Sequence, residues 1–302
     1  MSRAVSLPPR APSEIEVVAH RGASAEAPEH TLAAYRQALA LGADAAECDV
    51  RMTRDGVLVC VHDRRIHRTS TGRGVVSALD LAELERHRVV RRRSRGAAIR
   101  RRPVRPGADD GSGEAPDEPD EDAGRLLTLD RLLDYVTSSP GRVRLAIETK
   151  HPTRHAGQVE VALLASLRRF GLLAGGRPPE WAGGPAVRVM SFSPTALRRV
   201  RLLAPDLPTV HLVRQVLPRS RSRVVPPAGS AVGPSLALLR QHPGLVRRLH
   251  RAGLQVHVWV VNSERDMRFA AALGVDAIIT DEAAALMRVL GREGPRDLSG
   301  TG

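Results

Sequence analysis

The chain has 302 residues, which is long for one ordinary domain but within the range of a single α/β barrel. Its composition, 42% apolar and 26% charged, is that of a folded globular protein and excludes disorder for most of the chain. The net charge of +13 suits an anionic partner, but only 2% of residues are aromatic and no nucleic-acid-binding motif is present. We therefore expect no nucleic acid partner.

Short apolar runs alternate with amphipathic stretches along the chain, which is the rhythm of βαβ units. The expected strands are 15–19, 44–50, 143–149, 187–191, 209–213, 229–232, 255–261 and 276–279. The expected helices are 31–40, 129–137, 158–170, 194–203, 243–251, 263–273 and 282–290. This pattern predicts an α/β fold, a TIM (β/α)8 barrel over residues 15–292, with tails at 1–14 and 293–302.

The second strand is followed by a segment that does not fit the repeat. Residues 56–61 are an apolar run after an Asp55-Gly56 turn, which predicts a hairpin arm over the barrel mouth that delivers His62. Residues 86–124 begin as an arginine run and continue as a Gly/Pro/Asp/Glu tract without hydrophobic periodicity. We expect an insertion, disordered in part, whose oppositely charged halves neutralise each other.

The cysteines and the N-terminus bear on the cellular setting. Cys48 and Cys60 lie in apolar runs without a CxxC context and are expected to be buried, reduced thiols. Residues 1–16 carry prolines and charges without an apolar signal region, and no stretch reaches transmembrane length. We expect a cytoplasmic protein without stable membrane insertion; the sequence does not indicate an oligomeric state.

Strand alternation brings three acids to one place. Glu47 and Asp49 share a face of the second strand, and Glu148 and Lys150 share the corresponding face of the third. Carboxylates inside a barrel are costly unless they are paired or bound to a cation. Three carboxylates without cysteine make a hard oxygen site, which favours Mg²⁺ or Ca²⁺ over zinc, with Mn²⁺ as a further candidate.

Two further residue types support a site at this end of the barrel. His20 ends the first strand, and barrel active sites form where strands end. Lys150 is the only lysine and Asn262 the only asparagine, which indicates that chemistry requires them. For Lys150 we expect a phosphate or carboxylate contact.

These residues belong to the segments VAHRG, PEHT, GADAAECDV, TRDGVLVCVHD, LAIETK, VWVVN and GVDAIITD. In order and spacing, over residues 17–281, the chain resembles the glycerophosphodiester phosphodiesterase family. The resemblance implies a TIM barrel in which Glu47, Asp49 and Glu148 bind a divalent cation and His20 and His62 act as acid and base. It also implies that Arg21 and Lys150 hold the phosphate, that Glu29 organises the site and that Trp259 lines the pocket.

The implied reaction is hydrolysis of a small glycerophosphodiester to glycerol phosphate and an alcohol. Either water attacks phosphorus, or the glycerol 2-hydroxyl attacks first and forms a cyclic phosphate; the resemblance suggests the second route. One alternative is a lysophospholipase D acting on lysophospholipids. Another is a nonenzymatic basic protein that binds nucleic acid or an acidic polymer through its arginine runs.

The chain departs from the family pattern at three positions. His30 replaces a common asparagine, and we expect it to face solvent or to pack at a helix start. Val260 and Ala277 replace a usual threonine and glycine, and neither change removes a ligand. His211 ends a strand and is a weaker pocket candidate.

Overall fold

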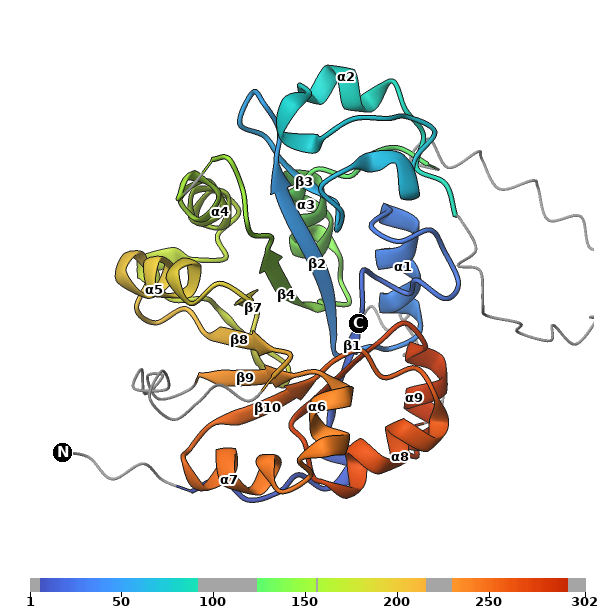
Figure 1. Ribbon diagram of the computed structural model, residues 1–302, viewed down its shortest axis with the longest axis vertical. Helices are drawn as coiled ribbons and strands as arrows, with labels where there is room; N and C mark the ends of the chain where they lie inside the picture. Colours follow the sequence, from blue (N-terminus) through green and yellow to red (C-terminus); the bar gives the residue numbers. More distant parts are fainter. Residues whose placement is uncertain (1–5, 92–123, 156, 216–229, 293–302) are drawn as a thin grey trace, which may run out of the picture.

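The computed structural model describes residues 6–91, 124–155, 157–215 and 230–292 as a closed barrel surrounded by helices (Figure 1). Most of the expected insertion therefore lies outside the described residues. Strand β1 pairs in parallel with both β2 and β11, and this double pairing closes the ring. The eight parallel strands are β1 (Glu16–Ala19), β2 (Ala45–Met52), β4 (Arg144–Thr149), β7 (Val187–Ser191), β8 (Thr209–Val213), β9 (Ala231–Pro234), β10 (Gln255–Val258) and β11 (Ala277–Thr280). The predicted TIM barrel is confirmed.

Helices cover the outside of the ring, and short polar side chains start several of them. Thr31, Thr128, Ser193 and Ser263 each accept a hydrogen bond from the backbone N–H three residues later. The covering helices are α1 (Leu32–Ala40), α3 (Leu129–Ser138), α4 (Gln158–Arg169), α5 (Pro194–Leu203), α6 (Leu236–Gln241), α7 (Leu245–Arg251), α8 (Glu264–Ala272) and α9 (Ala283–Val289). The expected helix at 243–251 is α7; α6, which precedes it, was not predicted.

A small cap covers one side of the barrel mouth. Strand β3 (Leu58–Cys60) pairs antiparallel with the end of β2, as the hairpin prediction required. It continues into the 3-10 turns η2 (Ile66–Arg68) and η3 (Val76–Ala78) and the helix α2 (Leu81–Glu85), which lies at the top of Figure 1. The cap has an apolar core of its own, made of Val59, Val61, Ile66, Val76, Leu84 and Leu126. The remaining short elements are η1 (Pro12–Glu14), η4 (Ala174–Gly176) and the strand pair β5 (Glu180–Trp181) and β6 (Gly184–Pro185).

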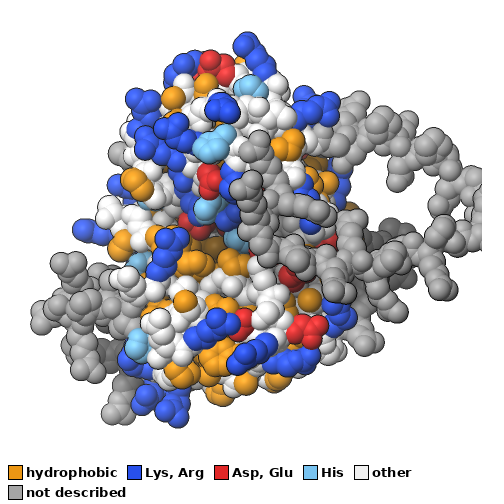
Figure 2. Space-filling view, turned by 45° about the vertical axis from the view of Figure 1, so that its right-hand side comes forward, with side chains coloured by type: hydrophobic (Ala, Val, Ile, Leu, Met, Phe, Trp, Pro, Cys, Tyr) orange, Lys and Arg blue, Asp and Glu red, His pale blue; other side chains and the backbone are white. Residues whose placement is uncertain are grey.

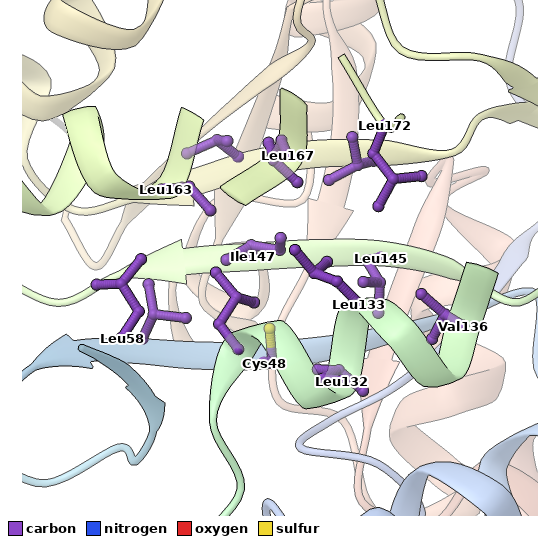
Figure 3. Packing of buried hydrophobic residues seen from close by; sticks show 14 of the residues in the cluster. Cys48, Leu58, Leu132, Leu133, Val136, Leu145, Ile147, Leu163, Leu167 and Leu172 are labelled. Atoms are coloured by element: carbon purple, nitrogen blue, oxygen red, sulfur yellow. The ribbon is translucent and has the colours of Figure 1, made fainter. Parts of the chain in front are cut away.

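The outward faces of β2 and β4 pack against helices. Leu145 and Ile147 of β4 lie between Leu133 of α3 and Leu163 of α4 (Figure 3). Cys48 packs in the same cluster and, like Cys60, is buried and unpaired, as expected. The alternate residues of these strands must therefore point into the barrel.

The barrel interior is layered. At the amino ends of the strands, Glu16 pairs with Arg144 at 3.0 Å and with Arg188 at 2.9 Å. Above this ionic layer lies a small apolar layer: Val18, Ala45, Ala146, Met190, Val210, Leu212, Ala231, Ala277 and Ile279. The layer at the carboxyl ends of the strands is polar, and it contains the residues singled out in the sequence. None of the described helices is both long and apolar enough to cross a membrane.

Candidate active site

Three carboxylates meet above the apolar layer. Glu47, Asp49 and Glu148 are all buried, and each offers an oxygen within 4.8 Å of the others. The register of the sheet causes this, since β2 and β4 pair Asp49 directly with Glu148. The strand parity read from the sequence therefore predicted this cluster correctly.

Two cations lie against the cluster. The Nζ atom of Lys150 is 2.7 Å from Oε1 of Glu148 and 2.8 Å from Oδ1 of Asp49. The Nε atom of Arg21 is 3.1 Å from Oδ2 of Asp49, and its backbone N–H donates to Oε2 of Glu47 at 3.0 Å. Arg21 has a φ of 60°, which the tight turn after β1 imposes. Its neighbour Gly22 has a φ of 81°, and a Cβ there would lie 2.7 Å from Ala34.

The carboxylates differ in their affinity for protons. Burial and the neighbouring Asp49 raise the pKa of Glu47 well above its usual value and that of Glu148 to about 7. Burial also acts on Asp49, but the hydrogen bond to His30 and the charge of Lys150 hold its pKa well below the usual value. The positive charges of Arg21 and Lys150 therefore do not fully neutralise the negative charges of three buried carboxylates.

This imbalance fits a divalent cation. The donors are all oxygens, they are buried, and they are close enough to share one ion. Glu47, Asp49 and Glu148 could therefore hold a divalent metal ion, which would supply positive charge to a bound phosphate.

His20 lies beside the carboxylate cluster and has a carboxylate partner of its own. Its Nδ1 atom is 2.6 Å from Oδ1 of Asp281, and its Nε2 atom is 4.0 Å from Glu47. Asp281 is oriented by Asn262, whose Nδ2 donates at 2.6 Å, and by the hydroxyl of Ser24 at 3.0 Å. Burial opposes ionisation of Asp281, but the bond to His20 lowers its pKa to about 2. The only asparagine of the chain thus supports the partner of a histidine.

His62 extends into the pocket from the cap and, like His20, has a carboxylate partner. Its Nδ1 atom lies 2.6 Å from Oδ1 of Asp63. Burial, together with the charges of Arg21 and Lys150, lowers the pKa of His62 to about 4, although Asp49 works against this. His62 is therefore a neutral imidazole near pH 7, with Nδ1 donating to Asp63 and Nε2 free to accept.

Glu29 connects the cap to the barrel. Arg68 donates to both of its oxygens at 2.7 Å, and Arg21 donates to Oε1 at 2.9 Å. The Nε atom of Arg68 also lies 2.5 Å from Asp63. Glu29 is therefore linked to the carboxylate cluster through Arg21, and to His62 through Arg68 and Asp63.

His30 takes the second of its two expected placements, packing at the helix start. It is 3% exposed, so a solvent-facing position is wrong. Its Nε2 atom lies 2.9 Å from Oδ2 of Asp49 and its Nδ1 atom 3.0 Å from the hydroxyl of Tyr35. Burial lowers the pKa of His30, and a neutral ring can donate to Asp49 while it accepts from Tyr35. The side chain thus packs at the start of α1 but also orients a carboxylate of the cluster.

The opposite wall of the pocket is apolar. Trp259 donates from Nε1 to the carbonyl of Gly233 at 2.6 Å and meets Phe192 edge to face at 5.2 Å between ring centroids. The guanidinium of Arg214 lies 4.7 Å from the centre of the Phe192 ring. The pocket is lined by His20, Arg21, Glu47, His62, Glu148, Lys150, Met190, Phe192, Leu212, Arg214, Trp259, Val260 and Ile279.

The structure thus brings together nearly all residues singled out in the sequence. Glu29 and Asp49 lie behind the pocket instead of lining it. His211 does not line it either, because its strand neighbours Val210 and Leu212 face the barrel interior. Reasoning from the sequence missed Asp281 and Arg214. Asp281 carried one available signal, since it follows the last strand directly.

A closed (β/α)8 barrel with ionisable groups gathered at the carboxyl ends of its strands defines a TIM-barrel enzyme. Residues 20–285 match the model of the glycerophosphoryl diester phosphodiesterase family. The chain belongs to this family and is a phosphodiesterase.

Individual relatives agree with the family model. A Mycobacterium tuberculosis protein named "Probable glycerophosphodiester phosphodiesterase 1" is 46% identical over 86% of each chain. The glycerophosphodiester phosphodiesterase of Bacillus subtilis is 33% identical over 89% of this chain and 84% of its own.

Solved structures of related proteins have the same fold. A crystal structure of a Silicibacter pomeroyi protein named after the same family matches with a TM-score of 0.73 and 28% identity, over 95% of each chain. A phosphodiesterase of Oleispira antarctica, solved with its product sn-glycerol-3-phosphate, matches with a TM-score of 0.69 and 20% identity, over 91% of this chain and 96% of that one.

Proposed function

We propose that the enzyme hydrolyses small glycerophosphodiesters to glycerol phosphate and an alcohol, with a divalent cation on Glu47, Asp49 and Glu148. One observation carries this proposal: the cluster of three carboxylates adjoins a pocket that is lined by two histidines, each with a carboxylate partner of its own at 2.6 Å. A phosphodiester needs its charge neutralised, its nucleophile deprotonated and its leaving group protonated. The pocket contains groups for all three tasks.

The cation, Arg21 and Lys150 neutralise the negative charge of the bound phosphate. When bound, the cation supplies positive charge to the non-bridging oxygens of the phosphate. Arg21 and Lys150 are fixed by ion pairs to Asp49 and line the same pocket. Both can therefore contact the phosphate without first being reoriented.

Proton transfer is assigned to the histidines according to their environments. His62 is neutral near pH 7 and takes the proton of the attacking hydroxyl on Nε2. His20 gives a proton from Nε2 to the alkoxide as the phosphorus–oxygen bond to the alcohol breaks. The ionised Asp281 stabilises the positive ring of His20 before this transfer.

The attacking hydroxyl is that of the substrate's own glycerol, which gives a cyclic phosphate that water then opens. A diester that lacks the glycerol 2-hydroxyl tests this route. We expect its hydrolysis to be slower by at least ~10²-fold, because intramolecular attack has a large entropic advantage. Equal rates for the two diesters would instead support direct attack by water.

The cation and the substrate class can be tested together. The enzyme is treated with chelator, resupplied with Mg²⁺, Ca²⁺ or Mn²⁺, and assayed on glycerophosphocholine and glycerophosphoethanolamine. We expect loss of turnover on chelation and recovery with at least one of these ions. Full activity of His20→Ala or Glu47→Ala would refute the proposed site.

The apolar wall supports a second candidate, a lysophospholipase D. Phe192, Trp259 and Met190 could contact an acyl chain that leaves the pocket on that side. Lysophospholipids are therefore assayed in the same panel. A kcat/KM for lysophosphatidylcholine above that for glycerophosphocholine would favour this activity.

A further inference from the structure

A second hollow lies next to the active site, on the other side of Lys150. Its volume is about 240 Å³, far more than the ~15 Å³ that one water requires. It is lined by Arg51, Met52, Arg64, Val76, Ser77, Lys150, Pro152, Thr153 and Arg154. Four of these residues are cationic and none is acidic.

The inward rows of two strands produce this charge pattern. Glu47, Asp49 and Arg51 point to one face of β2, and Glu148 and Lys150 to the same side of β4. In both rows, a cation follows the carboxylates toward the carboxyl end of the strand. The hollow lies directly beyond the catalytic carboxylates.

The arginines have no carboxylate partner in the described part of the chain. Arg51 donates to the backbone carbonyl of His62 at 2.9 Å, and Arg154 donates to the carbonyl of Ser77 at 3.4 Å. By contrast, Arg68 and Arg21 close by are both bound to Glu29.

The wall that carries Arg154 is held in place. His151, three residues earlier, has its Nε2 atom 2.7 Å from Oε1 of the fully buried Glu160. The other oxygen of Glu160 accepts from Arg199 at 2.7 Å. Arg154 therefore extends from an anchored turn beside the hollow.

We propose that this hollow is a second anion subsite, which binds a phosphate group on the alcohol side of the substrate. This inference rests on the proposed function, and it names the preferred substrate class as glycerophosphodiesters whose alcohol carries a further phosphate. Arg64 and Arg154 bind that phosphate, and Lys150 lies between it and the scissile one. Guanidinium groups suit this task because they donate two parallel hydrogen bonds to phosphate oxygens.

The test compares two substrates and a matched set of variants. Glycerophosphoglycerol and the same diester with a terminal phosphate are assayed with wild type, Arg64→Gln, Arg154→Gln and the double variant. Arg65→Gln is the control, because it removes the same charge one residue away and Arg65 does not line the hollow. All assays are run at physiological salt and again at high salt, which screens long-range attraction.

We expect wild type to prefer the phosphate-bearing diester in kcat/KM. Each single variant lowers that preference by about tenfold, as the loss of a charged hydrogen bond predicts. The rate on glycerophosphoglycerol and the behaviour of Arg65→Gln stay unchanged. Equal kcat/KM for both substrates in wild type, or an equal loss in Arg65→Gln, would overturn the subsite.

A binding measurement separates this inference from the proposed function. Inorganic phosphate is titrated by calorimetry into wild type and the double variant. If neither diester is hydrolysed, the proposed function fails, and weaker phosphate binding by the double variant still supports the subsite. If both proteins bind inorganic phosphate equally, the subsite is wrong.

Discussion

The Nδ1 atom of His20 lies 2.6 Å from Oδ1 of Asp281, a residue 261 positions later in the chain. The two belong to the turns after β1 and β11, which are paired neighbours in the barrel. This contact gives His20 a fixed ring orientation and an anionic partner, which a proton donor requires.

Replacing Asp281 with asparagine should therefore impair proton transfer and leave the fold intact. We expect kcat to fall ~10²- to 10⁴-fold, as when the carboxylate behind a catalytic histidine is neutralised elsewhere. Steady-state kinetics measures this change. Asp266→Asn, in helix α8, is the control and should keep full turnover; a kcat for Asp281→Asn near that of wild type would contradict the role.

His30 should affect metal binding more than substrate binding. His30→Ala removes the hydrogen bond to Asp49, and loss of such a support typically weakens a metal site ~10- to 100-fold. Titration with Mn²⁺ by calorimetry measures the Kd directly. His30→Asn, which restores the residue common in the family, should recover part of the affinity, and His67→Ala on the exposed cap should change nothing. An unchanged Kd in a folded His30→Ala protein would show that the contact is only structural.

Lys150 should show opposite effects on metal and substrate. Its ammonium group contacts two of the three carboxylates, so Lys150→Met removes a competing positive charge and should tighten Mn²⁺ binding. The same change removes a phosphate contact and should lower kcat/KM by ~10²- to 10³-fold. Calorimetry and kinetics on one protein preparation measure both. Weaker metal binding in Lys150→Met would contradict the competition.

The lowered pKa of Glu29 should make the free energy of unfolding depend on pH under acidic conditions. Arg68 and Arg21 lower its pKa to about 2 although burial opposes this, against a usual value near 4.5. A lowered folded-state pKa stabilises the protein above the usual value, and the contribution is lost as pH falls from about 4.5 toward 2. Urea denaturation should show Glu29→Gln to be less stable by about 3 kcal/mol at pH 7, with the gap closing near pH 2. A gap of constant size across that range would exclude linkage to this carboxyl group.

The barrel could be predicted because its strands are apolar, short and regularly spaced. The carboxylate cluster could be predicted because strand parity assigns Glu47 and Asp49 to one face whatever the rest of the fold does. The small helix α6 was missed because its six residues run into the next helix without a strand between them. Boundaries of short elements depend on packing that a single sequence does not reveal.

The residues that orient the catalytic groups were harder to predict. The environment of His30 depends on Asp49, which is distant in sequence, so the local helix-start pattern left open whether His30 faces solvent or packs. Asp281 ends the GVDAIITD segment, but only the closure of the ring brings it to His20. Arg51 is one of many arginines in the chain, and the sequence does not show that its side chain lines the same hollow as Lys150.

The pairing of β1 with β11 also determines at which stage of chain synthesis His20 can meet Asp281. Strands β2 and β4, which carry the three clustered carboxylates, leave the ribosome well before β11 does. His20 is made earlier still, yet it has no Asp281 to contact until nearly the whole chain has emerged. Under the proposed mechanism, a nascent or truncated chain that lacks its last strand also lacks the partner of His20 and should be inactive, so that turnover indicates a complete barrel.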